Sequence, residues 1–222
     1  MKKLLTTVML LMLALTLTAS AADQSDEKAS EIKKPLRLAR LPLIILSEEP
    51  DEDALAGLEL KLSRAIHVPL NGTLKAVEYL PASEAAAQLQ DIWSKLRKKD
   101  KKARLQAAME ELSTRMKADM VICPILRRYS QDVMIGASML NGENRMISDA
   151  EVILIVYEDD TKEVTLKKAA RSYNGEESNW GTARFLADDC MSEVIVTTDV
   201  REKVLRRTPI AERKEVERKL VD

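Results

Sequence analysis

Histidine, cysteine, glycine and aromatic residues are scarce in this 222-residue chain, and each shortage argues against a class of function. The single histidine, His67, and two cysteines far apart in the sequence cannot supply the clustered ligands of a zinc site. The six glycines show no GxGxxG spacing, so a nucleotide-binding loop has no basis. Aromatic residues make up only 3%, which argues against a carbohydrate groove or a single-strand stacking site. We therefore expect no cofactor and no metal.

The charges nearly balance, with 35 basic and 36 acidic side chains and a formal net charge of −1. Such a balance argues against a general nucleic-acid binder. A hydrophobic content of 45% beside 32% charged residues is typical of a globular protein with a heavily charged surface.

Residues suited to catalysis are few and poorly grouped. His67 is expected at the carboxyl end of a helix, where it complements the helix dipole, and no GxSxG motif accompanies it. Asp159 and Asp160, like Asp188 and Asp189, are adjacent and so point in different directions rather than forming an acid/base couple. We expect no catalytic residue and a non-enzymatic protein. The alternative is an exported hydrolase with a site of dispersed carboxylates or serines.

The first 21 residues have the three parts of a secretory signal peptide. Lys2 and Lys3 form the basic start, Val8 to Leu17 the apolar run, and small residues the end, with cleavage expected between Ala21 and Ala22. The apolar run is too short to span a bilayer, and no cysteine follows the cleavage site to carry a lipid anchor. We expect a soluble, exported product, periplasmic or extracellular, with no transmembrane span in the mature chain.

Hydrophobic spacing behind a polar leader at residues 22–35 predicts a single domain over residues 36–200. Its class is α/β (α+β): a mixed β-sheet with packed helices in the order βαβα-βββα. The expected strands are 36–46, 74–80, 119–128, 133–140, 146–158 and 162–173, and the last helix runs from Thr182 to Thr197. The strand at 119–128 should be central and must bulge or lose a neighbour at Pro124. Residues 201–222 are expected to form a charged tail.

A basic run at residues 95–104 is the sharpest charged feature. Its seven cations are Lys95, Arg97, Lys98, Lys99, Lys101, Lys102 and Arg104. They could contact anionic lipid heads, cell-wall polymers or an acidic partner, whereas the plainer alternative is a solvated helix corner.

Cys123 and Cys190 leave two alternatives open. A disulfide between them is permitted in an exported chain. Both also lie in apolar patterns, one strand-like and one helix-like, where they could be small buried side chains.

Four segments resemble a group of bacterial envelope α/β domains: 38–45, 51–66, 112–126 and 152–164. The group comprises the TolB amino-terminal domain, the CsgG-type curli-secretion protein and the outer-membrane activators of penicillin-binding proteins. Ala118 and Asp119 match its pattern, whereas Pro124 stands near the position of a glycine. The resemblance implies the fold and an envelope setting, and it carries no catalytic residues.

These observations together predict an exported, soluble, non-enzymatic cell-envelope accessory or binding protein that acts through a protein partner. Direct attachment to an anionic envelope surface through the basic run is an alternative. An exposed apolar patch or an uncovered sheet edge would favour the partner, and a pocket with converging titratable groups would favour an enzyme.

Overall fold

The computed structural model describes residues 34–47, 50–68, 76–134 and 144–207. The chain separates into two units, Met1–Lys34 and Pro35–Asp222, and the account below concerns the second. The expected signal peptide with its cleavage site at Ala21 and Ala22 lies outside the described residues, as does nearly all of the leader.

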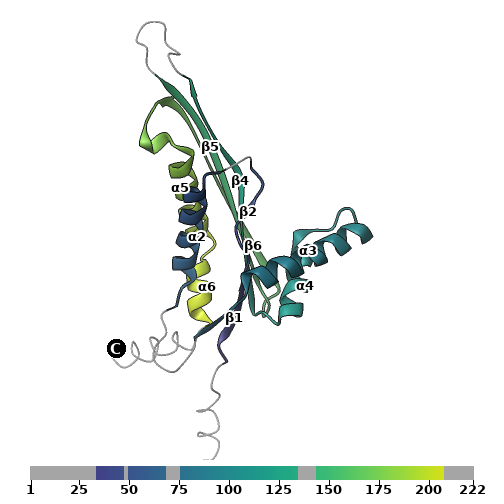
Figure 1. The fold of residues 1–222 in the computed structure, drawn as a ribbon. Helices are drawn as coiled ribbons and strands as arrows, with labels where there is room; N and C mark the ends of the chain where they lie inside the picture. Colours follow the sequence, from purple (N-terminus) through teal and green to yellow (C-terminus); the bar gives the residue numbers. More distant parts are fainter. Residues whose placement is uncertain (1–33, 48–49, 69–75, 135–143, 208–222) are drawn as a thin grey trace, which may run out of the picture. The chain divides into compact units, whose positions relative to one another are not determined.

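The described residues form a six-stranded mixed sheet (Figure 1). Its strands are β1 (Leu36–Arg40), β2 (Ile44–Ile45), β3 (Val77–Leu80), β4 (Met120–Met134), β5 (Arg145–Glu158) and β6 (Glu163–Glu176). The order is β3-β1-β4-β5-β6, and β2 continues beside β4 where β1 ends. β1 pairs in parallel with β3 and β4, whereas β4, β5 and β6 pair antiparallel. The predicted α/β (α+β) class with a mixed sheet is confirmed.

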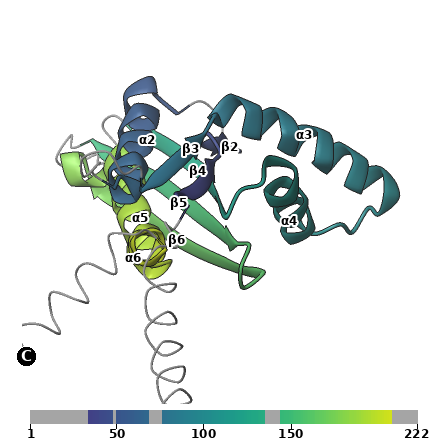
Figure 2. The same ribbon diagram turned by 90° about the horizontal axis from the view of Figure 1, so that it is seen from below.

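Helices cover both faces of this sheet (Figure 2). One face carries α2 (Glu52–Ile66), α5 (Ala183–Thr197) and α6 (Val200–Arg206), and a short 3-10 turn, η1 (Asn179–Gly181), precedes α5. The other face carries α3 (Ala82–Lys99) and α4 (Leu105–Met116). Figure 1 shows that α3 and α4 lie beside only one end of the long strands.

The helix boundaries follow local chemistry. The side chain of Asp51 caps α2 by accepting from the amide of Ala54 at 2.6 Å, so Pro50 lies before the helix and not in its first turn. α3 begins directly behind Pro81 and has no side-chain cap. α4 ends at Lys117, whose φ of 51° is the left-handed conformation that closes many helices.

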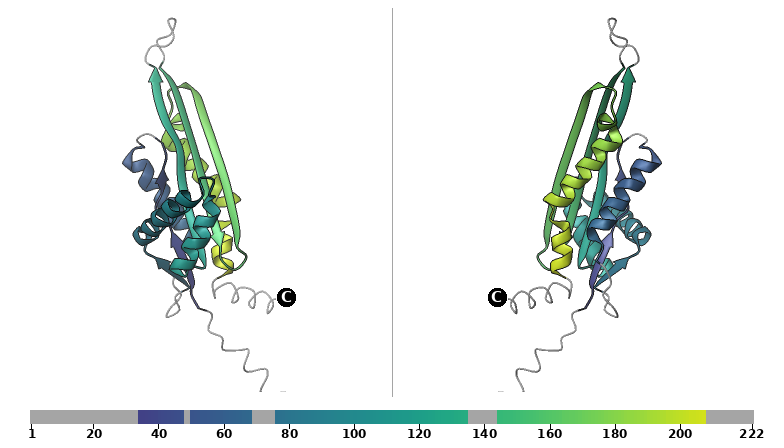
Figure 3. Two further views of the ribbon diagram at one scale, coloured as in Figure 1. Left: turned by 90° about the vertical axis from the view of Figure 1, so that its right-hand side faces the viewer. Right: turned by 90° about the vertical axis from the view of Figure 1, so that its left-hand side faces the viewer.

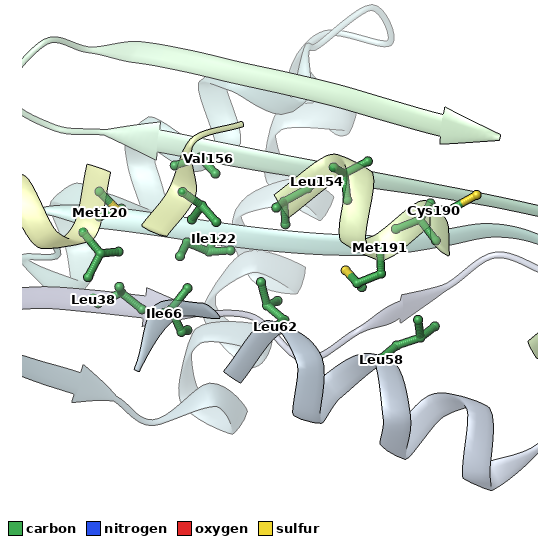
Figure 4. Packing of buried hydrophobic residues seen from close by; sticks show 14 of the residues in the cluster. Leu38, Leu58, Leu62, Ile66, Met120, Ile122, Leu154, Val156, Cys190 and Met191 are labelled. Carbon is green, nitrogen blue, oxygen red and sulfur yellow. The ribbon is translucent and has the colours of Figure 1, made fainter. Parts of the chain in front are cut away.

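The hydrophobic core lies in two layers, one on each face of the sheet. The first joins Leu58, Leu62 and Ile66 of α2 to Ile122 and Leu154 of the sheet and Met191 of α5, as Figure 4 shows. The second joins Ile92, Met109 and Leu112 of the opposite helices to Val121, Ile155 and Tyr157. Because β4 is buried on both faces from Met120 to Leu126, its predicted central position is confirmed.

Two strand predictions were wrong in detail. The first strand, expected over 36–46, is interrupted between β1 and β2, and Pro124 pairs with Leu154 of β5 while facing that interruption. β4 thus lacks a neighbouring strand on this side at Pro124, as expected. The segments 119–128 and 133–140 were expected as separate strands, but β4 continues to Met134. Its second half is exposed apart from the half-buried Tyr129 and lacks the apolar alternation that marks a strand.

Packing continues past the domain boundary expected at residue 200. Val200 and Val204 of α6 are buried in the same core layer as α2 and α5. The amine of Lys203 contacts Glu158 and donates to the hydroxyl of Thr165 at 2.8 Å. The beginning of the expected tail is therefore a packed helix.

Candidate functional site

A cleft of about 340 Å³ opens between α2 and the start of α5. Its floor on α2 is made of small and apolar residues. The lining residues are Ala54, Gly57 and Leu58 from α2, and Asn179, Thr182, Arg184, Phe185 and Asp188 from η1 and α5. The right-hand view of Figure 3 shows these two helices side by side on one face of the sheet.

An exposed aromatic pair stands at this cleft. Trp180 is 71% exposed and Phe185 is 39% exposed, and their rings meet edge to face with centroids 4.9 Å apart. Phe185 is the only phenylalanine in the chain, and Trp180 is one of two tryptophans. The chain has few large aromatic side chains, and two of them lie together in solvent. Large exposed aromatic side chains of this kind are favourable to bury, because each has a large apolar area.

Hydrogen bonds fix the turn that carries Trp180. Ser178 caps η1, with its hydroxyl oxygen accepting from the amide of Gly181 at 3.2 Å. Thr182 caps α5 by accepting from the amide of Phe185 at 3.3 Å, while its hydroxyl donates to the carbonyl of Asn179 at 2.9 Å. The side chain of Gln131 accepts from the amide of Ala183 at 2.9 Å and ties the helix start to β4. Trp180 is therefore presented from an ordered turn, although it contacts mostly solvent.

The side chain of Tyr173 supports the same turn through contacts that we call the tyrosine clasp. The ring of Tyr173 on β6 lies against Gly181, and its hydroxyl donates to the carbonyl of Glu176 at 2.7 Å. The hydroxyl of Ser178 donates to the Tyr173 oxygen at 3.3 Å. The loop between β6 and α5 is thus wrapped around one aromatic ring.

The two charged residues that line the cleft, Arg184 and Asp188, each pair with a residue outside its lining. Asp188 accepts from the amine of Lys61 at 2.5 Å, and Arg184 lies 3.7 Å from Asp53. A guanidinium does not lose its proton in a protein, so Arg184 and Asp188 do not make an acid/base couple. The cleft offers apolar contact with charged edges rather than converging catalytic groups.

A hydrogen bond from β4 fixes the start of α2, which forms one wall of the cleft, to the sheet. The hydroxyl of Tyr129 on β4 donates to Asp51, and this hydrogen bond lowers the pKa of the carboxyl below its usual value. Burial, together with the same bond, raises the pKa of Tyr129. The wall of the cleft on α2 is therefore anchored at its N-cap.

The basic run of 95–104 lies at the end of α3 and in the turn to α4. Lys95 pairs with Asp91 at 2.7 Å, and Arg97 lies 5.7 Å from the ring centre of Trp93. The remaining cations of the run are exposed and have no carboxylate partner within the described residues: Lys98, Lys99, Lys101, Lys102 and Arg104. The fold thus gathers them on one projecting tip.

The two cysteines are free thiols buried in different core layers. Cys123 belongs to the layer under α3 and α4, and Cys190 belongs to the layer under α2 and α5, so the sheet lies between them. The disulfide alternative is therefore not realised, and the structure shows both as small buried side chains. Burial raises the pKa of Cys123 to about 12 and that of Cys190 to about 11.

The other titratable residues considered from the sequence are dispersed. His67 is exposed at the carboxyl end of α2. The amine of Lys162 donates to Asp159 and lowers the pKa of that carboxyl, whereas Asp160 pairs with Arg207. Asp189 pairs with Arg171. Within the residues the structure describes, no three His, Cys, Asp or Glu side chains come together as a metal site would require. No described helix has the length and apolar character needed to cross a membrane.

The sequence did not predict the aromatic pair, because residues 174–181 lie between the expected strand 162–173 and the helix from Thr182, where no element was expected. A signal was present, since Ser178 and Thr182 are both residue types that cap helices. The sequence also did not predict a group of cations around Glu151 on the long strands, described below.

Comparison with known proteins reveals a loose structural likeness and no sequence match. No family model and no curated protein matches the chain. A hypothetical protein, CT253 from Chlamydia trachomatis, is 14% identical with a TM-score of 0.41, over 77% of this chain and 98% of the other. The lipoprotein GNA1162 from Neisseria meningitidis is 14% identical with a TM-score of 0.38, over 72% and 98%. The LpoB C-terminal domain from Escherichia coli is 12% identical with a TM-score of 0.31, over 68% and 87%. These structures include a lipoprotein, whereas the resemblance to TolB and CsgG stays a prediction.

Proposed function

We propose that this chain is an exported, soluble, non-enzymatic cell-envelope accessory or binding protein, and that it holds a protein partner at the cleft between α2 and α5. The observation that carries the proposal is the exposed Trp180, fixed in a capped turn beside a cleft whose α2 side is small and apolar. The amino-terminal signal-peptide pattern supports export.

An ordered, exposed tryptophan suits protein recognition for two physical reasons. Burying a side chain of this size removes on the order of 150–250 Å² from water, and tryptophan is enriched among residues that dominate binding energy. Because the turn is already held by its caps, little conformational entropy is lost when a partner covers it.

The proposal predicts that Trp180→Ala weakens partner binding by roughly 30-fold or more, which corresponds to about 2 kcal/mol. The mature protein is used as bait on an extract of its own envelope, and proteins bound by the parent are compared with those bound by the variant. Val196→Ala is the matched control, because Val196 is 70% exposed on α5 and lies outside the cleft lining.

A partner retained by Val196→Ala and lost by Trp180→Ala would support the site. Equal recovery by all three proteins, or no enriched protein at any salt concentration, would overturn it.

The projecting basic tip favours a second function, attachment to an anionic envelope surface. All of its seven cations except Lys95 have no carboxylate partner among the described residues, and each contributes about 1 kcal/mol near an anionic membrane. Because the end of α3 and the turn to α4 project away from the sheet (Figure 1), several of them can reach a surface at once.

Changing Lys98, Lys99, Lys101 and Lys102 to glutamate is expected to abolish sedimentation of the protein with phosphatidylglycerol vesicles at low salt. Changing the same four to arginine keeps the charge and should preserve sedimentation, and neutral phosphatidylcholine vesicles should not sediment the parent. If the parent ignores anionic vesicles, or the glutamate variant still sediments, the tip is a solvated corner.

A further inference from the structure

One buried carboxylate on the long strands holds three cations. The side chain of Glu151 on β5 is 4% exposed, whereas those of Arg127, Arg128 and Lys168 are each 54% exposed. Arg127 donates to one carboxylate oxygen at 3.0 Å, and Nε of Arg128 donates to the other at 2.8 Å. The amine of Lys168 lies 3.8 Å from the first oxygen. We call these four residues the strand cluster.

A β-bulge brings the two arginines together. Consecutive residues of a regular strand point to opposite faces, so Arg127 and Arg128 should diverge. The register of β4 against β5 shifts between Leu126 and Arg128, which leaves Arg127 as the extra residue beside the Arg128 and Glu151 pair. Both guanidinium groups consequently reach the same carboxylate. Bulges often serve to re-aim a side chain next to a functional site.

The strand cluster lies on the part of the sheet that α3 and α4 leave uncovered. Glu151 shares a face with Ile153 and Ile155, which pack toward those helices, but β4 is exposed or half-exposed from Arg127 onward. The left-hand view of Figure 3 shows the long strands extending beyond both helices. The outer sides of the cations therefore face solvent.

The cluster carries more positive charge than its carboxylate can balance. Burial tends to raise the pKa of Glu151, but the hydrogen bonds from Arg128 and Arg127 outweigh it and lower the pKa, so the group is ionised at neutral pH. Three cations against one anion leave a charge of +2. Within the described part of the chain these cations have no other ion pair.

Glu151 holds both arginines in place and leaves most of their N–H donors available. Each guanidinium has five N–H groups and uses only one nitrogen on the carboxylate. Forked donors of this kind match the oxygens of phosphate. A second carboxylate, Asp149, lies on the same face of β5 and accepts a hydrogen bond from the hydroxyl of Ser172. Its negative charge disfavours an anion on the side of the cluster next to Asp149.

We infer that Arg127, Arg128 and Lys168, held by Glu151 at the bulge of β4, form a binding site for a phosphate group. A phosphate carrying up to two negative charges balances the surplus of +2. The group can belong to a free phosphomonoester or to a phospholipid head, and both present the same oxygens to the arginines. This site is separate from the cleft and from the basic tip, so it stands independently of the functions proposed above.

The inference is tested by titrating the mature protein with inorganic phosphate and following the arginine Nε–H signals by NMR. Saturable shifts are expected for Arg127 and Arg128, with half-saturation below about 10 mM. Arg127→Gln or Arg128→Gln should weaken binding by roughly tenfold or more, because each removes a charge-assisted hydrogen bond. Arg145→Gln is the matched control, since Arg145 lies on β5 and bonds Asn174 outside the cluster.

Vesicles containing phosphatidic acid distinguish the two sources of the phosphate. Saturable phosphate binding that is lost in the cluster variants supports a free ligand. Sedimentation with these vesicles that is lost in the cluster variants, but kept when Lys98 and Lys99 are changed to glutamate, supports a lipid head. Shifts that do not saturate, or that are equal in the parent and both cluster variants, would overturn the site, provided that thermal unfolding shows the variants folded.

Discussion

Lys203→Ala is expected to lower the free energy of unfolding by about 2–4 kcal/mol, because it removes a partner from a buried charge. The side chain of Glu158 is 3% exposed and that of Lys203 is 14% exposed. After the change, the ion-pair partner left to the carboxylate among the described residues is Arg206, which lies 3.4 Å away on a side chain that is 70% exposed. Urea denaturation of parent and variant, followed by circular dichroism, measures the difference.

Arg201→Ala provides the control, since Arg201 is an exposed residue of the same helix, α6. It should change the stability by less than about 0.5 kcal/mol. Replacing Lys203 by methionine and Glu158 by leucine together should recover much of the loss, because no charge is then left buried. Equal stabilities for Lys203→Ala and Arg201→Ala would show that α6 does not depend on this pair.

The sequence alone could not place the end of the domain beyond residue 200, because the packing of α6 depends on the long-range pair of Lys203 and Glu158. A lysine is rarely buried without a partner, and its partner Glu158 lies 45 positions away on β5. Local spacing therefore assigned the segment to a solvated tail. By contrast, Leu58, Leu62 and Ile66 recur at helical intervals and are all buried on one face of α2, so local spacing is enough to reveal this face.

The binding features depend on contacts that spacing does not reveal. The strand cluster arises from one extra residue at Arg127, which changes where two side chains point without changing composition. The basic run was visible as a pattern, and the structure adds which of its cations lack a carboxylate partner. Trp180 was counted as a scarce aromatic, but only the caps at Ser178 and Thr182 show that it is presented to solvent from a fixed turn.

Gly181→Ala is expected to cost about 1–3 kcal/mol of stability and to weaken partner binding while Trp180 itself is unchanged. A Cβ atom at this buried position would lie within 2.9 Å of three ring atoms of Tyr173. The ring cannot retreat easily, since its hydroxyl donates to the carbonyl of Glu176 and accepts from the hydroxyl of Ser178. The turn that holds Trp180 must therefore shift.

Gly57→Ala is the matched control for the stability measurement alone, because a Cβ at Gly57 in α2 meets nothing within 4 Å, whereas Gly57 also lines the cleft. An alanine inside a helix is favoured over glycine, so this variant should gain about 0.5–1 kcal/mol of stability. Urea denaturation gives both stabilities, and capture of the partner that depends on Trp180 gives the binding. If Gly181→Ala binds as the parent does despite its lower stability, the position of the turn does not matter and the partner does not recognise Trp180 as a fixed anchor. If binding falls at a temperature where the variant is fully folded, the tyrosine clasp positions Trp180 for recognition.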